Sequence, residues 1–225
     1  DEVEVAVYVE DPRGSTGGDA VRLDVQPTDA PRVDLLSPVD SGVNYYTDHP
    51  VFLEAYVSDA EDLAEDLAVD WNSDRDGVLE APSSPDSDGL VRSYVDLTEG
   101  EHLIRARAKD TTEKVGTDVV SIYVQGPNNA PECGWILPED GTVLVTAEPI
   151  ILSGWASDVD VPVDWLTVTW SSNQDGALAS VPASTTDDEA IGEASITVSD
   201  LSTGEHTLTM TVSDEVGASC TVERL

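Results

Sequence analysis

Basic residues are scarce in this chain. Of its 225 residues only 10 are lysine or arginine, against 46 aspartates and glutamates, which gives a formal net charge of −36. Since phosphate groups are repelled by such a surface, the composition argues against nucleic acid and anionic membranes as partners. The acids are spread along the whole chain, which fits either a solubilising surface or carboxylates that bind cations.

Long apolar runs are missing as well. No stretch of 18 apolar residues occurs, so we expect no membrane insertion in this segment. No charged-then-apolar leader opens the chain, but the chain opens inside a repeat, so this absence carries little information about export.

Catalytic motifs are also absent. The sequence has no H-E-x-x-H, no G-x-S-x-G, no glycine-rich phosphate loop and no C-x-x-C. Of the three histidines, His102 and His206 precede the same strand in two copies of a repeat, which indicates a structural turn, and His49 stands alone near a proline. We therefore predict that the protein is not an enzyme.

One pattern occurs three times. Apolar residues alternate with polar ones, as in a strand with one buried face, and the strand runs into an acidic turn followed by glycine. The turns lie at Asp11, Asp110 and Asp214. The three copies span residues 2–14, 100–116 and 204–217.

The repeat offset sets the domain boundaries. Pro31 and Pro131 lie 100 residues apart, and Trp71 and Trp170 lie 99 apart. Since about 100 residues suffice for a core of their own, we predict two complete repeats preceded by the last strands of another, joined by short linkers with two prolines each. The predicted ranges are 1–30, 31–129 and 130–225.

Each complete repeat reads as seven short strands without helical periodicity, with a tryptophan on the third strand. This is typical of an all-β, two-sheet sandwich, with Trp71 and Trp170 at the centres of the two cores. The acidic stretch 59–68 is expected to be a loop with at most one helical turn.

The third strand and its turn read W-N-S-D-R-D-G-V-L at 71–79 and W-S-S-N-Q-D-G-A-L at 170–178. Together with the stretch 204–217, these motifs resemble the tandem Ig-like domains, of the PKD and cadherin-like kind, of long bacterial surface proteins. The resemblance implies tandem seven-stranded Ig-like sandwiches at the cell surface or outside the cell. It also implies neighbouring repeats of the same chain as partners, with self-association into fibres as a variant.

The two cysteines fall on the first and last strands of the second repeat. Such strands commonly lie side by side in a sandwich, so we predict a disulfide between Cys133 and Cys220 and an oxidising compartment. Two buried free thiols are the alternative. In the first repeat we place Val33 and Val119 or Val120 at the comparable positions.

Acidic loops and linker residues are expected to meet at the end where the chain enters each repeat. Carboxylate and amide oxygens are ligands that Ca²⁺ prefers, so these loops are candidate calcium sites. The alternative is that the acids cap turns and face water. The candidates are Asp158, Asp160, Asp214, Asn128 and Asn129 in the second repeat, and Asp59, Glu61, Asp62, Asp110 and Asp29 in the first.

A second metal candidate begins like an EF-hand loop. Asn72, Asp74 and Asp76 precede Gly77, but the twelfth position is Ser83 rather than glutamate. Repeat two has Ser171, Asn173 and Asp175 there, so we interpret this stretch as a turn.

Two aromatic residues, Tyr56 and Trp155, fall on the outward side of the second strand. They are expected to pack under a neighbouring loop or domain, or to form a partner surface. Two functions therefore remain open: a structural segment of a stalk, adhesin or fibre, stiffened by Ca²⁺, and a carbohydrate- or protein-binding module.

Overall fold

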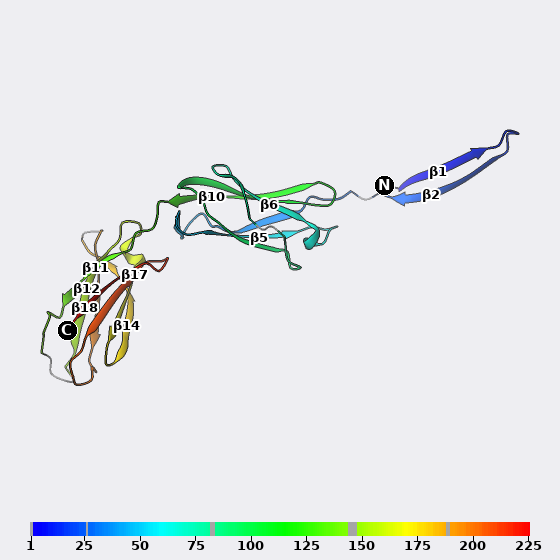
Figure 1. The fold of residues 1–225 in the computed structure, drawn as a ribbon. Coiled ribbons are helices and arrows are strands. Elements are labelled where there is room, and N and C mark those ends of the chain that lie inside the picture. Colours follow the sequence, from blue (N-terminus) through cyan, green and yellow to red (C-terminus); the bar gives the residue numbers. More distant parts are fainter. Residues whose placement is uncertain (1, 26, 82–83, 144–147, 188–189) are drawn as a thin grey trace. The chain divides into compact units, whose positions relative to one another are not determined.

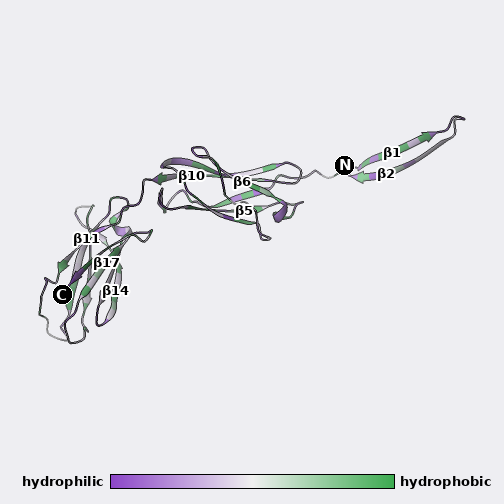
Figure 2. Ribbon diagram, in the orientation of Figure 1, coloured by the Kyte–Doolittle hydropathy of each residue, from purple (hydrophilic) through white to green (hydrophobic). Residues whose placement is uncertain are grey.

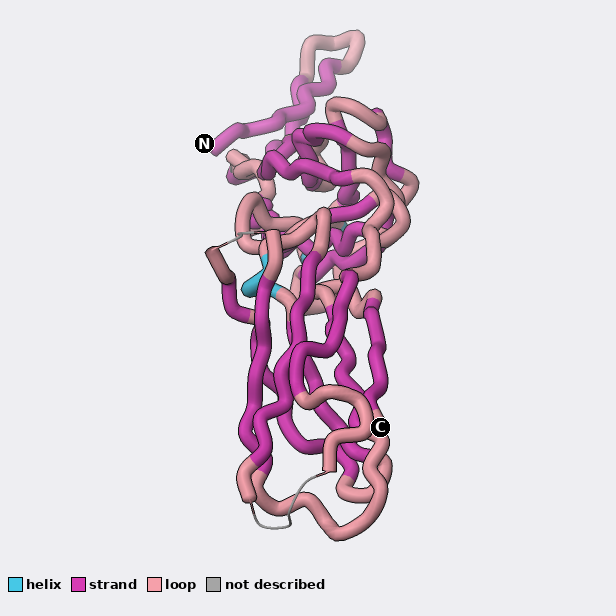
Figure 3. The backbone as a smooth tube through the Cα atoms, turned by 90° about the vertical axis from the view of Figure 1, so that its left-hand side faces the viewer, coloured by secondary structure: helices cyan, strands magenta, loops and turns pink. Residues whose placement is uncertain are grey.

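The chain is almost entirely β-structure. The computed structural model describes residues 2–25, 27–81, 84–143, 148–187 and 190–225. Strands and loops make up nearly the whole tube in Figure 3. The chain divides into two compact units, Asp1–Gly126 and Pro127–Leu225.

The first unit opens with a two-stranded hairpin, β1 (Glu2–Glu10) and β2 (Thr16–Asp24). Every residue of both strands is exposed. The alternation of the sequence places Val3, Val5 and Val7 on one face, and Val3 and Val5 lie opposite Leu23 and Val21. This apolar face belongs to a sheet of two strands only (Figure 2).

The first sandwich follows in the same unit. A three-stranded sheet in the order β3-β5-β8 packs on a five-stranded sheet in the order β4-β10-β9-β6-β7 (Figure 1). The strands are β3 (Arg32–Ser37), β4 (Tyr45–Tyr46), β5 (Val51–Ser58), β6 (Ala68–Ser73), β7 (Gly77–Leu79), β8 (Leu90–Val95), β9 (Gly100–Lys109) and β10 (Val115–Gln125).

The second sandwich has two four-stranded sheets, in the orders β11-β12-β16-β15 and β14-β13-β17-β18. The strands are β11 (Glu132–Leu137), β12 (Ile150–Ser157), β13 (Thr167–Ser172), β14 (Gly176–Pro182), β15 (Ser184–Thr185), β16 (Gly192–Val198), β17 (Leu208–Ser213) and β18 (Ser219–Arg224).

Tandem Ig-like sandwiches joined by short proline-containing linkers, the predicted fold class, are thus the architecture of the chain. In the described residues each sandwich holds the seven expected strands and one further two-residue strand, β4 in the first and β15 in the second. A single 3₁₀ turn, η1 (Ala64–Asp66), lies in the acidic stretch 59–68, as expected, and η2 (Val163–Trp165) occupies the corresponding place in the second sandwich.

Strand alternation explains the two cores. Trp71 and Trp170 have 0% and 1% of their surface exposed, as expected for the central residues of each sandwich. The second core is filled differently from the first: Trp135 packs edge-on against Trp170 with ring centroids 5.0 Å apart, and Met210 lies against Gly154.

Candidate functional site

The acidic turn has the same geometry in all three copies. The backbone N–H of Asp110 donates to the carbonyl of Lys114, and its Oδ1 accepts from the N–H groups of Thr112 and Lys114. Asp214 makes the same bonds with residues 216–218, and Asp11 does so with residues 13–15. The Asp side chain thus closes each hairpin, which is the capped-turn alternative of the sequence analysis.

Linker and loop residues do meet at the entrance of the second sandwich. Asn128 Nδ2 donates to Asp214 Oδ2 at 2.8 Å. The backbone N–H and side-chain amide of Asn129 both donate to Asp160 Oδ2, at 2.6 and 3.0 Å. The linker is therefore held by the loops that follow β12 and β17.

Asp158 belongs to the same loop as Asp160 and lies near enough to Asp160 and Asp214 to feel their charges. Its Oδ1 accepts from the N–H groups of Asp160 and Val161, while its Oδ2 is buried without a hydrogen-bond partner in the structure. Burial raises the pKa of Asp158, and the charges of Asp160 and Asp214 add to the rise against the hydrogen bonds to its Oδ1.

The first sandwich repeats this arrangement. Asp59 Oδ1 accepts from the N–H groups of Glu61 and Asp62, and Asp59 Oδ2 is buried without a partner. Glu61 accepts from the linker N–H of Asp29 at 3.3 Å, and both Asp62 oxygens accept from Thr111. Burial alone would raise the pKa of Asp110, and its bonds to Lys114 and Thr112 outweigh this and lower it.

At least one oxygen is therefore already engaged in each of seven carboxylates: Asp59, Glu61, Asp62, Asp110, Asp158, Asp160 and Asp214. Among the residues that the structure describes, no group of three or more His, Cys, Asp or Glu side chains is arranged to hold a metal ion. Ca²⁺ takes six to eight oxygens. Of the carboxylates discussed, Asp59 and Asp158 alone have a buried oxygen left without a partner, so a cation here would have to recruit oxygens from turn bonds or water.

The EF-hand-like stretch is a turn. Asp74 Oδ1 accepts from Leu103 N–H, Asp76 Oδ2 accepts from Thr98 N–H, and Gly77 adopts φ 78°. In the second sandwich Asn173 and Asp175 make the same bonds to Thr207 and Ser202.

The two histidines at matched positions stabilise these turns through hydrogen bonds at both ring nitrogens. Buried His102 links Ser73 Oγ to the carbonyl of Thr98, and His206 links Ser172 Oγ to the carbonyl of Ser202. This is the structural turn role expected from their matched places. The half-buried His49 lies beside Asp48.

A disulfide joins Cys133 on β11 to Cys220 on β18, with Cα atoms 5.9 Å apart. Cys220 lies opposite Val212, and the corresponding pair in the first sandwich is Gly116 and Ala108. The first-repeat counterpart of Cys220 is therefore Gly116. The prediction that Val119 or Val120 corresponds to Cys220 was wrong. The acidic hairpin fixes the register between β9 and β10, and counting from it leads to Gly116.

The two outward aromatics differ in surroundings. Tyr56 is 37% exposed beside Gly89. Trp155 packs over Gly134, where an added Cβ would lie 2.3 Å from the indole nitrogen. Sequence reasoning missed Tyr94, which is 65% exposed and packs with its ring tilted against that of Phe52, with centroids 5.0 Å apart. The alternation of 50–57 and 91–97 placed both residues outward and so contained the signal.

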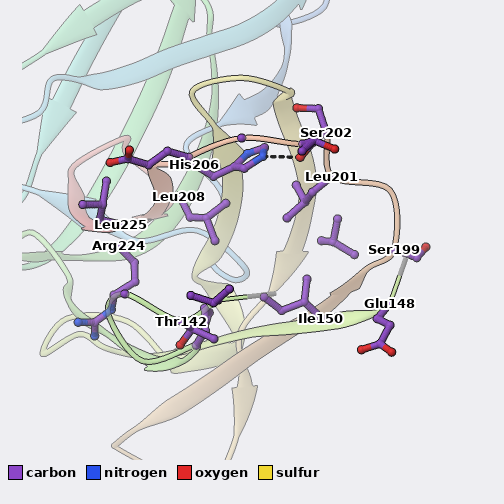
Figure 4. Close-up of a pocket in the computed structure, with 17 residues that line it drawn as sticks. Thr142, Glu148, Ile150, Ser199, Leu201, Ser202, His206, Leu208, Arg224 and Leu225 are labelled. Carbon is purple, nitrogen blue, oxygen red and sulfur yellow. Dashed lines mark hydrogen bonds between the residues drawn. The ribbon is translucent and has the colours of Figure 1, made fainter. Parts of the chain in front are cut away.

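Sequence reasoning also missed a cavity of about 440 Å³ in the second sandwich. It lies where β17 begins, at the opposite end of that strand from Asp214. Leu201, Leu208 and Ile150 extend toward it, with His206 and Ser202 at its rim (Figure 4). The first repeat has Tyr45 and Tyr46 in the loop before its second strand, whereas residues 139–149 contain no aromatic, and this difference was the available signal.

No described helix is long and apolar enough to cross a membrane. No family model and no curated protein matches the sequence. Among solved structures, the chain is similar to fibronectin(III)-like modules of Clostridium thermocellum CbhA, with a TM-score of 0.59 and 16% identity over 85% of this chain and 90% of that one.

Two weaker likenesses are to Ig-containing proteins. A chimeric titin Z1Z2 gives a TM-score of 0.43 at 16% identity, covering 88% of this chain and 96% of that one. Dpr2 Ig1-Ig2, solved in complex with DIP-Theta Ig1-Ig3, gives 0.40 at 13%, covering 85% and 96%. At such identities the likeness concerns the fold, and the fold of this chain is a series of Ig-like β-sandwiches.

Proposed function

We propose that the chain is a structural segment of a long extracellular repeat protein of the PKD or cadherin-like kind, in which sandwiches are threaded in series. The observation that carries this proposal is the register of the N-terminal hairpin. Val5 lies opposite Val21, as Ile104 lies opposite Val120 in the first sandwich. The next pairs match too: Val7 with Asp19 as Ala106 with Asp118, and Val9 with Gly17 as Ala108 with Gly116.

The residues at two of these positions, Asp118 and Gly116, contact the first strand of the first sandwich. Asp118 Oδ2 accepts from the N–H of Leu35 on β3, and Gly116 lies so close to β3 that an added Cβ would be 1.8 Å from the carbonyl oxygen of Pro31. In the hairpin, Asp19 bonds the N–H of its neighbour Ala20, and Gly17 has no atom within 4 Å of its Cβ direction. The hairpin thus has the residues that receive a first strand, which supports assigning 1–30 to a preceding Ig-like repeat.

The test is to add the preceding residues of the parent polypeptide. The hairpin amides should exchange with solvent rapidly in the 225-residue chain and become protected by at least about a hundredfold in the extended chain, because the apolar face would then be buried. Unchanged exchange in the extended chain would contradict the assignment. Exchange in the first sandwich serves as the internal control.

We further propose that Ca²⁺ stiffens the entrance of each sandwich. Asp59 and Asp158 support this, because the same oxygen is buried without a partner in both repeats. A cation at Asp158 would offset the charges of Asp160 and Asp214 and hold the linker residues Asn128 and Asn129 to their own sandwich. The net charge of −36 supplies a further reason for cation binding.

Calcium dependence is measured by thermal unfolding and by small-angle scattering in millimolar CaCl₂ and in excess chelator. We expect a higher unfolding temperature and a narrower distribution of lengths with calcium. Asp158→Asn should reduce the effect, and Asp200→Asn, which removes the same charge at an exposed site, should not. No difference between calcium and chelator would remove calcium from the proposal and leave the serial role standing.

A binding module is the second candidate, because one outer sheet face carries exposed aromatics. Phe52 pairs with Tyr94 across β5 and β8, and Tyr56 lies on the same face four residues further along β5. Carbohydrates and proteins both use such surfaces. Binding on a glycan array that is lost with Tyr94→Ala but kept with Trp155→Ala would favour this function.

The disulfide supports an extracellular setting, since such bonds persist in oxidising compartments.

A further inference from the structure

Basic side chains gather on one strand of this acidic chain. Three of the ten lysines and arginines, Arg105, Arg107 and Lys109, occupy alternate positions of β9. The residues between them are buried, so all three side chains lie on the outer face of the five-stranded sheet. They span about 13 Å along the strand, and we call them the basic row.

The basic row is not a requirement of the repeat. The register of β17 against β13 matches that of β9 against β6, and it places Thr209, Thr211 and Ser213 at the three positions. The second sandwich therefore forms the same sheet with hydroxyl side chains there. Exposed ion pairs also add little to stability. The charges of the row thus need an explanation other than folding.

Two members of the row pair with carboxylates of the chain itself. Arg107 Nε lies 3.0 Å from Asp70 Oδ2, and Lys109 Nζ lies 2.8 Å from Glu113 Oε2. The Asp70 and Glu113 side chains are 52% and 77% exposed, so both pairs are open to water and can exchange partners at little cost. The row therefore binds carboxylates in pairs that another carboxylate can replace.

Arg105 is the member of the row that lacks a carboxylate. Its cross-strand neighbours are the uncharged Asn72 and Val119, and it forms no ion pair with the residues that the structure describes. An arginine presents its N–H groups in a planar fork that fits a carboxylate through two parallel hydrogen bonds. The exposed Arg105 thus offers a place for the acidic group of a ligand.

The strand beside the row contributes hydroxyls and an aromatic ring. The outward residues of β10 are Val115, Thr117, Val119, Ser121 and Tyr123, and the ring of Tyr123 is 56% exposed. Because β9 lies between β6 and β10, its backbone is engaged in the sheet, and an extended peptide cannot add to it through backbone hydrogen bonds. A ligand of this face must be recognised by side chains. Charged groups, hydroxyls and an exposed ring together suit an acidic carbohydrate.

The net charge of −36 does not prevent such binding. At physiological ionic strength, charges further away than about 8 Å are largely screened, so a bound carboxylate responds mainly to the nearest side chains. The basic row sets three cations against the two carboxylates that pair with it. The face therefore has a local excess of positive charge.

We propose that the outer face of β9 and β10 binds a linear polysaccharide whose sugars carry carboxylates. The carboxylates would bind Arg105 and displace Asp70 from Arg107, and a sugar ring would pack on Tyr123. Glu101 lies opposite Tyr123, so the contact at that end is made by the ring and its hydroxyls. The site lies on the other sheet from the exposed aromatic pair and does not depend on a role in a repeat array.

The test titrates a hexasaccharide of galacturonic acid into the ¹⁵N-labelled 225-residue chain at about 0.15 M salt. Saturable amide shifts are expected at residues 103–109 and 117–123. The matching residues of the second sandwich, 207–213, should not shift. Arg105→Gln should weaken binding at least about tenfold. Arg92→Gln removes the same charge from the outer face of the other sheet and should change binding less than about twofold.

Two further ligands separate the alternatives. Maltohexaose, a neutral sugar chain of the same length, should produce no shift, and hexaglutamate, which matches the charge, should bind at least about tenfold more weakly than the acidic sugar. Equal binding of hexaglutamate would assign the row to an acidic polypeptide and overturn the proposal. Equal weakening by Arg105→Gln and Arg92→Gln, or no shift at residues 103–109, would overturn it as well.

Discussion

The two sandwiches share their turns and differ in how they fill the space between their sheets. Both have the Asp hairpin after the sixth long strand and the Ser–His brace between the third and the sixth. The first is closed by Tyr46 and by Ile122 and Val124 near the end of β10, and its first strand packs directly on Gly116. The second has a disulfide at that place, a Trp135–Trp170 pair at its centre and a cavity at its far end.

This difference separates what fixes the topology from what completes the core. The turns recur residue by residue, because a hairpin with the wrong turn loses its register and turns the apolar face outward. The fillings vary, because a core tolerates exchanges that keep its total volume. The comparison can be tested by substitutions that act on one sandwich only.

The largest effect should come from the disulfide. Reduction, or the double substitution Cys133→Ala and Cys220→Ala, should lower the unfolding free energy of the second sandwich by about 2–5 kcal/mol, because the bond closes a loop of 87 residues. Hydrogen exchange followed by mass spectrometry reports on each sandwich. The first should be unchanged, and a loss shared equally by both would contradict their independence.

The next effect concerns the contact between β3 and β10. Gly116→Ala should destabilise the first sandwich by about 3 kcal/mol, since the new methyl group would meet the backbone oxygen of Pro31. Gly17→Ala places the same change at the same register of the hairpin, where no atom lies within 4 Å, and should be neutral. Chemical unfolding of both variants measures the difference. Similar unfolding curves for the two variants would show that the backbone near Pro31 can accommodate a methyl group at position 116.

A third change tests whether the small Gly154 and the large Met210 complement each other in the second core. Gly154→Ala should cost about 1–3 kcal/mol, because its methyl carbon would lie 2.3 Å from Met210 Sδ. Adding Met210→Ala recreates the Ala55 and Ala106 of the first sandwich and should recover part of that loss. A double variant whose free energy is the sum of both single losses would show that the two residues are not complementary.

The smallest effect concerns pH. The folded-state pKa of Asp158 is raised, so the stability that its protonated form contributes is present below the ordinary value of 3.8 and is lost as pH rises through the raised pKa. In chelator at neutral pH, Asp158→Asn should therefore stabilise the second sandwich, by less than about 1 kcal/mol because the site is partly solvent-screened. The gain should vanish in strong acid. Destabilisation at neutral pH would mean that the carboxylate has a favourable partner.

Much of the fold follows from the sequence. The offset of 99 residues between Trp71 and Trp170, together with the three acidic hairpins, predicts sandwiches in series. These signals can be read because strand alternation and turn chemistry depend on residues close in sequence. The cysteine pair follows in the same way, since the first and last strands are neighbours. These features depend on residues close in sequence or on one topological rule.

The candidate site is less predictable. The sequence brings Asp158, Asp160 and Asp214 to one end, but it does not reveal that one oxygen of each accepts backbone N–H groups. The pairing of Gly154 with Met210 and the cavity beside Leu208 depend on side-chain volumes across two sheets. Periodicity reports which face is buried and contains no measure of how completely it is filled.

The cross-link also sets how the chain would respond to tension. A pull applied to the two ends can draw out the first sandwich completely, whereas the bond between Cys133 and Cys220 takes 87 residues out of the extensible length of the second. At about 3.4 Å per residue, the disulfide prevents roughly 300 Å of chain from extending. Under load the first sandwich could therefore extend fully, whereas the second would remain short.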